Sequence, residues 1–133
     1  MNMSLTTCFI QISDPETALG FYRDALGLEV RNDVDNGGFR WITVGVPGQN
    51  VSIVLSNYVA GSPEDTDTVA ALLAKGALNG AHFSTDRLDD LFKKLTDAGV
   101  EVVSEPADQP WGVRDCAVRD PAGNLIRIDQ MSA

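Results

Sequence analysis

The stretch ISDPETALGFYRDALGLEV, from Ile12 to Val30, decides how this chain folds. It leaves an apolar strand, begins a helix at Asp14 and Pro15, and ends that helix at Gly27. Aspartate is a favoured N-cap residue, and proline at the first helical position loses no hydrogen bond, because the N–H there has no partner within the helix. Glycine at the end of a helix readily takes the left-handed conformation that terminates it. The stretch therefore predicts strand, helix and strand in direct succession.

A second stretch, STDRLDDLFKKLTDAGVEV from Ser84 to Val102, repeats this layout 72 residues later. Asp86 and Gly99 take the places of Asp14 and Gly27, and each glycine follows its aspartate by 13 residues. A shared period of this length indicates a duplicated supersecondary unit. We therefore expect two copies of one module.

Alternating apolar and polar residues predict the strands of each copy. The expected strands are residues 6–12, 28–32, 39–46 and 51–58 in the first copy and 81–85, 100–104, 112–119 and 125–130 in the second. The order of elements predicts an α+β fold with a single domain, residues 1–133, made of two tandem βαβββ modules at 5–58 and 80–130. The linker at 59–79 is longer than a bare connection needs, so it either covers part of the molecule or is a solvated segment. Residues 68–75 within it can form a short helix.

Composition and charge restrict the partners of the chain. Its 133 residues are 44% hydrophobic and 22% charged, as in a globular domain. The net charge of −9 and the isoelectric point of about 4.3 argue against nucleic acid and anionic membranes as partners. No apolar run approaches the roughly 20 residues of a membrane span, and the N-terminus lacks the features of a signal peptide. We expect a cytoplasmic protein.

The two cysteines, Cys8 and Cys116, have no metal-binding spacing. The alternation along their strands places both on the side that faces the helices. The sequence therefore predicts two buried structural thiols, with a disulfide between them as the alternative.

The same alternation gives each sheet two different faces. One is aliphatic and must be covered by the amphipathic helices. The other carries aromatic, polar and charged side chains, namely Thr7, Phe9, Gln11, Trp41, Thr43, Ser52, Val54, His82, Ser84, Arg127 and Asp129. A concave apolar surface with a few polar groups is typical of a small-molecule pocket.

The order of elements and three motifs resemble the vicinal oxygen chelate superfamily, the group of glyoxalases, bleomycin resistance proteins and extradiol dioxygenases. The motifs are SDPETALGFYRDALGLEV, GAHFSTDRLDDLFKKLTDAGVEV and VRDPAGNLIRI, and the resemblance covers almost the whole chain. It implies that the strands curl into a cup-shaped mixed sheet with the ligand inside. It also implies a homodimer, in which the cup is often completed across subunits.

In the metal-dependent members of that superfamily, four side chains hold a divalent ion. The resemblance carries these positions onto Thr7, Val54, His82 and Arg127. Only His82 is a usual metal ligand; Val54 has no donor, and Arg127 is a fixed cation that repels the ion. We therefore expect no metal and no other cofactor. The alternative is a metal-dependent lyase, isomerase or dioxygenase whose ligands lie at other positions.

Several of the remaining candidates have both a functional and a structural interpretation. His82 is the only histidine, and it is either the general base of a metal-independent enzyme, a ligand contact or a satisfied polar group. Arg127 either clamps a carboxylate or phosphate or forms a salt bridge with Asp115 or Asp129. Trp41 stacks on a planar ligand or packs within the protein or its dimer.

The loop before the seventh strand supplies the last candidates. Trp111 lies in this loop and offers a second stacking surface, while Arg114 with Asp115 lies at the mouth of the cup or forms a surface pair. The expected ligand-binding residues are Thr7, Phe9, Gln11, Trp41, Ser52, Val54, His82, Trp111, Arg114 and Arg127, with His82 as the one catalytic candidate. The sequence thus predicts a glyoxalase/bleomycin-resistance-like protein that binds a small organic molecule.

Overall fold

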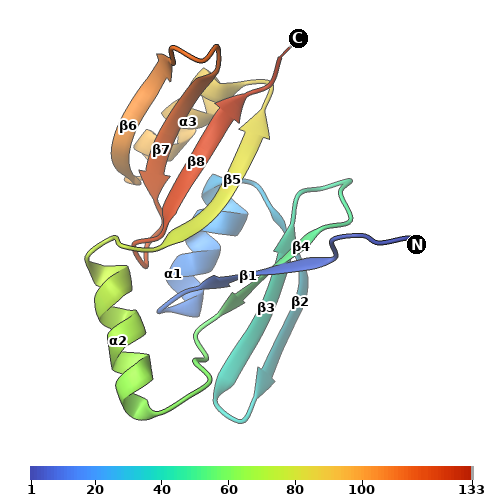
Figure 1. The fold of residues 1–133 in the computed structure, drawn as a ribbon, viewed down its shortest axis with the longest axis vertical. Helices are drawn as coiled ribbons and strands as arrows, with labels where there is room; N and C mark the ends of the chain where they lie inside the picture. Colours follow the sequence, from blue (N-terminus) through green and yellow to red (C-terminus); the bar gives the residue numbers. More distant parts are fainter. Residues whose placement is uncertain (133) are drawn as a thin grey trace.

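The computed structural model describes residues 1–132 and contains two four-stranded sheets (Figure 1). The elements are β1 (Thr7–Gln11), α1 (Pro15–Leu19), η1 (Gly20–Ala25), β2 (Glu29–Asn36), β3 (Phe39–Gly45), β4 (Ser52–Ser56), α2 (Pro63–Ala74), β5 (Asn79–Thr85), α3 (Leu88–Asp97), β6 (Glu101–Asp108), β7 (Arg114–Arg119) and β8 (Leu125–Gln130). The first sheet has the order β1-β4-β3-β2 and the second β5-β8-β7-β6. In both sheets the opening strand pairs in parallel with the last strand of its module, and the other pairs are antiparallel. The predicted α+β fold of two βαβββ modules is confirmed.

The first helix begins as predicted and then changes form. Asp14 caps it, because the backbone N–H of Thr17 donates to Asp14 Oδ2 at 2.9 Å. From Gly20 the α-helix continues as the π-helix η1, which has one more residue in each hydrogen-bonded ring. Gly27 follows with a φ of +82°, the left-handed conformation expected of a residue that ends a helix.

Helix α3 is not capped by the residue that the sequence predicted. Its N-cap is Arg87, whose side chain makes no capping hydrogen bond. Instead the backbone N–H of Leu88 donates to Oε1 of Gln130 in β8 at 2.9 Å, and Gln130 Nε2 donates to the carbonyl of Asp86 at 2.7 Å. The residue that satisfies the helix end thus comes from a strand 42 positions along the chain.

Strands β2 and β6 extend further than the alternation predicted. The sequence placed the end of β6 at Ser104 and a loop from Glu105, but the strand continues to Asp108. The pairing of β6 with β7 is irregular between Ser104 and Ala107. Pro106 lies in this interval, on the edge strand of the sheet, where its missing N–H removes no ladder hydrogen bond.

A single hydrophobic core joins the two modules. It takes Ile10 and Ile42 from the first sheet, Tyr22 from η1, and Cys116 and Ile128 from the second sheet, among others. The residues of the core therefore belong to both sheets and to the helices of both modules. Stability from apolar burial is shared between the halves in this arrangement.

The two cysteines do not share one environment. Cys116 is buried, as predicted, and burial followed by the charge of Asp115 raises the pKa of its thiol to about 11. Cys8 is exposed, which corrects the prediction of a second buried thiol, and both thiols are free. Cys8 precedes the part of β1 that is covered, since Ile10 is the first residue of the strand to be buried.

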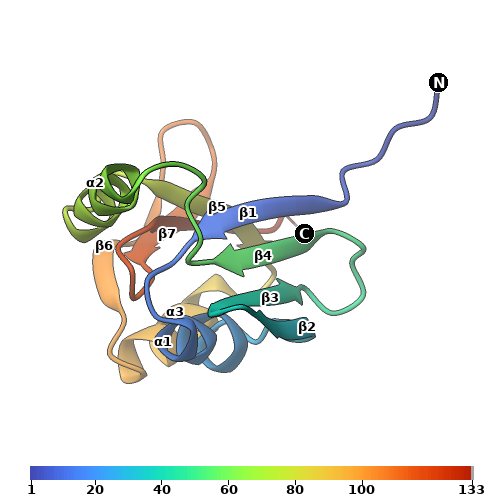
Figure 2. The same ribbon diagram turned by 90° about the horizontal axis from the view of Figure 1, so that it is seen from below.

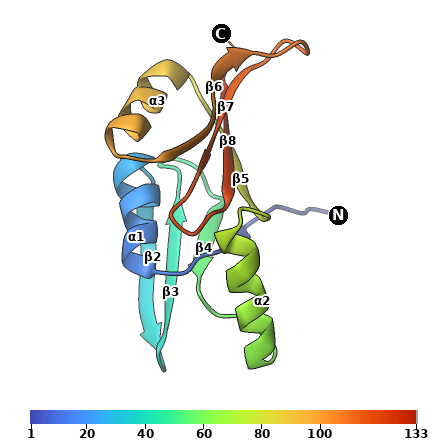
Figure 3. The ribbon, with the colours of Figure 1, turned by 90° about the vertical axis from the view of Figure 1, so that its left-hand side faces the viewer.

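The sheets meet at one edge of each. Strand β1 contacts β5, and the two strands cross at an angle (Figure 1, Figure 2). Helices α1 and α3 lie on one side of the second sheet, and α2, which forms most of the linker, lies on the other (Figure 3). Within residues 1–132, no helix has the length and apolar character that crossing a membrane requires.

Candidate functional site

The open side of the first sheet presents four exposed aromatic residues, Phe9, Phe39, Trp41 and Tyr58, here called the aromatic face. Phe9 is 65% exposed, and the other three are exposed by about half or slightly less. The rings form two edge-to-face pairs, Phe9 with Trp41 at 5.9 Å and Phe39 with Tyr58 at 4.9 Å between centroids. Aromatic surface of this extent on the outside of a protein is typical of a binding site.

A pocket of about 410 Å³ lies on the aromatic face. Its lining residues are Val34, Phe39, Arg40, Trp41, Ser56 and Tyr58. Strand pairing builds it, because Trp41 of β3 stands opposite both Val34 of β2 and Ser56 of β4. The volume falls within the range of about 300–1,000 Å³ that small-molecule pockets occupy.

The open side of the second sheet is charged rather than aromatic. His82, Asp115, Arg127 and Asp129, here called the charged face, come from β5, β7 and β8. His82 pairs with Arg127, and Asp115 with Asp129, in the strand register. The Nε2 atom of His82 lies 2.8 Å from Asp129 Oδ1, and Arg127 Nη1 lies 4.0 Å from Asp115 Oδ2. Charges of both signs are thus held in one small area.

Asp129 is incompletely satisfied in this cluster. Its Oδ1 atom is buried, yet within residues 1–132 no group donates a hydrogen bond to it. His82 is at ion-pair distance but does not meet hydrogen-bond geometry at this oxygen. Asp115, in contrast, accepts a hydrogen bond from Gln109 Nε2 at 2.9 Å. Because this oxygen is buried and His82 Nε2 lies 2.8 Å away, the carboxylate faces the imidazole and is not open to a bound group.

The aromatic and charged faces meet where β1 contacts β5. A depression of about 360 Å³ lies there, and both Phe9 and His82 line it. The imidazole is 58% exposed, so a molecule in this depression can reach it. The structure therefore places Phe9 beside Trp41 and His82 beside Arg127, and of these four predicted residues Phe9 and His82 line the depression.

Four other predicted residues lie on the open side of the first sheet, but each is covered, already hydrogen-bonded or distant from the pocket on the aromatic face. Val54 stands between Phe9 and Thr43 in the register and is only 1% exposed, since its neighbours cover it. Ser52 accepts a hydrogen bond from Arg31 Nη1 at 3.0 Å. Thr7 is exposed near the start of β1, and half-buried Gln11, at the end of that strand, lines a different cavity beside α2.

Arg114 forms ion pairs near the surface, in keeping with one of the two interpretations that the sequence left open. Its guanidinium pairs with Asp89 of α3 at 2.8 Å and with Asp108 of β6 at 3.5 Å. The alternation that turns Cys116 toward the helices also turns Arg114 that way. Trp111, in the loop between β6 and β7, is 70% exposed and is not among the residues that line the pocket or the depression described above.

The residues present do not fit a divalent metal ion. His82 and Arg127 face each other in the register, so a cation would meet the guanidinium beside its one imidazole ligand. Val54 has no donor atom, and Thr7 offers only a neutral hydroxyl. Among the residues that the structure describes, no three His, Cys, Asp or Glu side chains converge as metal ligands do.

The sequence prediction missed Phe39, Tyr58 and Gln109 as parts of the site, while it did name Asp115 as a possible ion-pair partner of Arg127. Phe39 lies two residues before Trp41 in the same strand, so the period of two was sufficient to find it. Tyr58 lies beyond the last paired residue of β4, where alternation no longer indicates which face of the sheet a side chain points to. Gln109 reaches Asp115 across the loop that joins β6 and β7, and no local pattern indicates such a contact.

Comparisons with known proteins agree with this architecture. The model of the Glyoxalase/Bleomycin resistance protein/Dioxygenase superfamily matches residues 4–128. The crystal structure of UcmS2 is similar with a TM-score of 0.88 and 30% identity, covering 98% of this chain and 100% of that one. TnmS3, an antibiotic binding protein from Streptomyces sp. CB03234, is similar with a TM-score of 0.78 and 29% identity, covering 99% of each chain.

A curated relative of similar length shares the same match. The uncharacterised protein YurT of Bacillus subtilis (strain 168) is 29% identical over 130 residues, which are 98% of this chain and 99% of YurT. The family model, the shared fold and the shared length are consistent with one another. The chain belongs to the glyoxalase, bleomycin resistance protein and dioxygenase superfamily.

Proposed function

We propose that this protein binds a small, planar organic molecule of the antibiotic type on its open sheet faces, without a metal ion. The observation that carries the proposal is the aromatic face, whose pocket of about 410 Å³ is formed largely by Phe39, Trp41 and Tyr58. Exposed indole and phenyl rings stack on planar ligands. The similarity to an antibiotic binding protein supports the same interpretation.

The charged face supplies the polar contacts of this proposal. Arg127 is about half exposed and only loosely paired with Asp115, so it can turn to an acidic group of the ligand. His82, whose imidazole is 58% exposed, can accept a hydrogen bond from an N–H or O–H group of the ligand or donate one to it. The ligand class is therefore a planar apolar body that carries at least one donor and one acceptor.

We further propose that two copies of the chain associate through their open faces. Phe9 and Trp41 leave a large aromatic area in contact with water in the single chain. A second copy placed over it encloses the ligand and removes that area from water. Sedimentation equilibrium is expected to give a mass near twice the 14.3 kDa of the chain. A monomer at all concentrations would leave the binding proposal in place and refute the dimer.

Two single-tryptophan variants test the binding proposal, because the chain has two tryptophans. Trp111→Phe leaves Trp41 as the reporter on the aromatic face, and Trp41→Phe leaves the exposed Trp111 as its matched control. Titration with bleomycin and with doxorubicin, in the presence of EDTA, is expected to quench Trp41 saturably with at least one of the two compounds. Fluorescence of Trp111 is expected to stay unchanged. Absence of saturable quenching of Trp41 by both compounds refutes the proposal.

The close approach of His82 to Asp129 favours a second candidate, a metal-independent acid–base enzyme. A carboxylate beside an imidazole orients the ring for proton transfer. His82→Ala separates the two functions, because a binding protein keeps most of its affinity without the imidazole. Mass spectrometry of the bound compound after incubation shows whether it has been changed. An altered mass with the unmodified protein, and not with His82→Ala, would favour the enzyme.

Metal analysis tests the metal-free part of the proposal. The purified protein is incubated with nickel, zinc, manganese or ferrous iron, passed through a desalting column and examined by elemental analysis. We expect no stoichiometric metal, because Thr7, Val54 and Arg127 supply no suitable ligands. Near-stoichiometric retention of one metal would restore the lyase, isomerase or dioxygenase alternative.

A further inference from the structure

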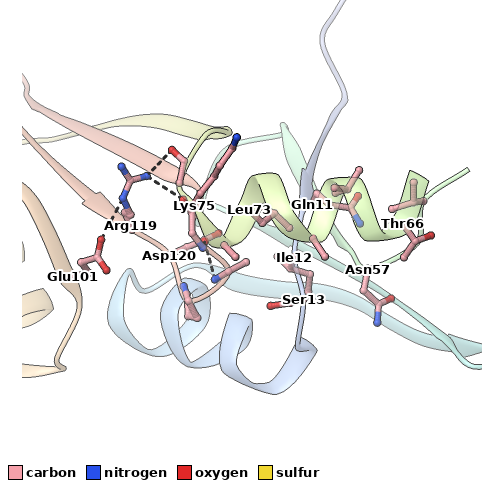
Figure 4. Close-up of a pocket in the computed structure, with 18 residues that line it drawn as sticks. Gln11, Ile12, Ser13, Asn57, Thr66, Leu73, Lys75, Glu101, Arg119 and Asp120 are labelled. Carbon is pink, nitrogen blue, oxygen red and sulfur yellow. Dashed lines mark hydrogen bonds and ion pairs between the residues drawn. The ribbon is translucent and has the colours of Figure 1, made fainter. Parts of the chain in front are cut away.

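Helix α2 borders a cavity that lies apart from the aromatic and charged faces (Figure 4). The cavity has a volume of about 660 Å³. Its walls come from the end of β1, the residues after β4, helix α2, and the turn between β7 and β8. Of the residues predicted to bind ligand, only Gln11 lines it. Both modules and the linker thus contribute to one cavity, which is partly open to solvent.

The helix is well formed but poorly packed. Ser62 and Asp65 cap its start reciprocally, the arrangement known as a capping box. Along the twelve residues of α2, however, only Leu73 is buried. Val69, which is half-buried, and Ala70, which is exposed, line the cavity. Tertiary packing supplies most of the stability of a helix in a protein, and a bound molecule can add apolar contacts to α2 here.

One end of α2 is held firmly to the second module. A Cβ atom at Gly123 would lie 2.0 Å from the carbonyl oxygen of Leu73, so the approach of the helix to this turn requires glycine. Arg119 strengthens the junction, because its Nη1 atom donates to the carbonyls of Gly76 and Gly123, each at 3.1 Å. The C-terminal end of the helix is therefore anchored, while the remainder stands over the cavity.

The cavity has two chemically different ends. Figure 4 shows Lys75 and Arg119 at one end and Asn57 at the other, with Leu73 and Ile12 between them. The Oδ1 atom of Asn57 is buried and has no hydrogen-bond partner among the residues that the structure describes. A buried acceptor without a donor is costly, so a donor group that reaches this oxygen is favoured.

The charge at the first end comes chiefly from Lys75. The Nε atom of Arg119 is already 3.2 Å from Glu101 Oε2, and two carbonyls occupy its Nη1 atom. Lys75, in contrast, forms no ion pair within residues 1–132. The carboxylates of Glu101 and Asp120 also line this end, but they are held by Arg119 and by Tyr22 with the backbone of the turn, so Lys75 is the cation that an anionic group would meet without an ion-pair partner.

We propose that the cavity beneath α2 is a second small-molecule site, which takes an organic anion with an apolar body and an N–H or O–H donor. The anionic group lies near Lys75, the apolar body lies between Leu73 and Ile12, and the donor hydrogen-bonds to Asn57 Oδ1. Occupation of the site completes the packing of α2. The site is independent of the planar ligand on the aromatic face.

Anilinonaphthalene sulfonate is a suitable probe, because it combines a sulfonate, an apolar ring system and an N–H group. We expect Lys75→Glu to weaken binding of the probe about tenfold, in keeping with the loss of a charge-assisted contact. The matched control is Lys93→Glu on α3, which makes the same charge change at a lysine that does not line the cavity. Equal affinities for the two variants would overturn the proposal.

Two further measurements locate the probe. Trp41→Ala removes part of the aromatic face. We expect this variant to retain at least one class of probe sites with unchanged affinity. Loss of all binding would place the probe on that face and overturn the proposal. Hydrogen exchange of residues 63–74 is expected to slow when the probe binds. No change in exchange would show that the probe does not pack against α2.

Asn57→Leu separates binding from stability. Replacing an unpaired acceptor with an apolar group of similar size leaves the free energy of unfolding unchanged or higher. If the amide contacts the ligand, the same variant still binds the probe more weakly, by a factor of about ten. Unchanged probe affinity in Asn57→Leu would refute the assigned hydrogen bond. These results do not depend on the bleomycin and doxorubicin titrations, so each site can fail separately.

Discussion

The phenol of Tyr22, in the helix of the first module, donates a hydrogen bond of 2.5 Å to Asp120 Oδ2 in the turn between β7 and β8. Both residues are buried. The other oxygen of Asp120 accepts the backbone N–H groups of Ala122, Gly123 and Asn124. One carboxylate thus shapes the DPAGN turn and ties it to the opposite half of the chain, which gives the two modules a polar connection in addition to their shared core.

Tyr22→Phe is expected to lower the free energy of unfolding by about 1.5–3 kcal/mol, the usual contribution of a hydrogen bond to a charged group. The variant keeps the ring in the core and removes only the donor to Asp120. Urea denaturation provides the measurement. Tyr58→Phe is the matched control, and we expect a change of about 0.5 kcal/mol or less because that side chain is half exposed. Equal losses in the two variants would contradict the role of the buried bond.

Alkaline pH is expected to destabilise the protein through Cys116 and Tyr22. Burial and then Asp115 raise the pKa of Cys116 from 9.0 to about 11, while burial and then Asp120 raise the pKa of Tyr22 above its ordinary value of 10.0. Each pKa is higher in the folded state, so the unfolded chain loses its protons first. The stabilising effect is therefore complete below about pH 9 and decreases as the pH rises.

The free energy of unfolding, measured by urea denaturation between pH 8 and pH 11, tests this dependence. It should be nearly constant up to about pH 9 and then fall, with each group contributing a slope of at most about 1.4 kcal/mol per pH unit. Cys116→Ala should flatten the fall that begins near pH 9, and Tyr22→Phe the part that begins near pH 10. A wild-type profile that stays level to pH 11 would show that neither group is protected by folding.

Two glycine-to-alanine variants are expected to have opposite effects. Gly123 has a φ of +115°, and a Cβ there would lie 2.0 Å from the carbonyl of Leu73. Gly123→Ala should therefore destabilise the fold by more than about 1 kcal/mol. Gly20 has helical angles and open space around its missing Cβ, so Gly20→Ala should stabilise it by about 0.4–1 kcal/mol. Thermal unfolding compares both variants with the wild type. A Gly123→Ala variant that is as stable as the wild type would contradict the close approach of this turn to Leu73.

Gln130→Ala is expected to cost about 0.5–2 kcal/mol, as the loss of a helix cap does. The side chain accepts the N–H of Leu88 at the start of α3 and donates to the carbonyl of Asp86. Asp86→Ala is the informative control, because the sequence predicted that residue as the cap. We expect it to change stability by about 0.5 kcal/mol or less in urea denaturation. The reverse order of effects would restore the local cap.

Local chemistry was sufficient to predict much of the fold. Asp14 and Gly27 begin and end the first helix because capping involves only neighbouring backbone groups. The alternation along the strands divided each sheet into an inner and an open face for the same reason, since successive side chains must point to opposite sides. Trp41 and His82 could therefore be placed on open faces without a structure.

The same rule decides between the two interpretations of Arg114 that the sequence left open. Arg114 lies two residues before Cys116 in β7, so alternation turns both side chains toward the helices. The alternative place at the mouth of a cup followed from its position beside a loop. The ion pair with Asp89 of α3 shows that Arg114 follows the alternation of side chains even at the end of this strand.

The sequence by itself determined the duplicated module, its helix ends and the division of its faces, because each depends on residues within a few positions of one another. Only the tertiary structure decided that Gln130 caps α3, that Cys8 is exposed, and that α2 stands over a cavity ending at Asn57. These features depend on how strands and helices distant in the chain pack together. The exposure of a side chain, a helix cap from a distant strand and the shape of a cavity are set only when those elements pack against each other. Local residue patterns do not specify that packing.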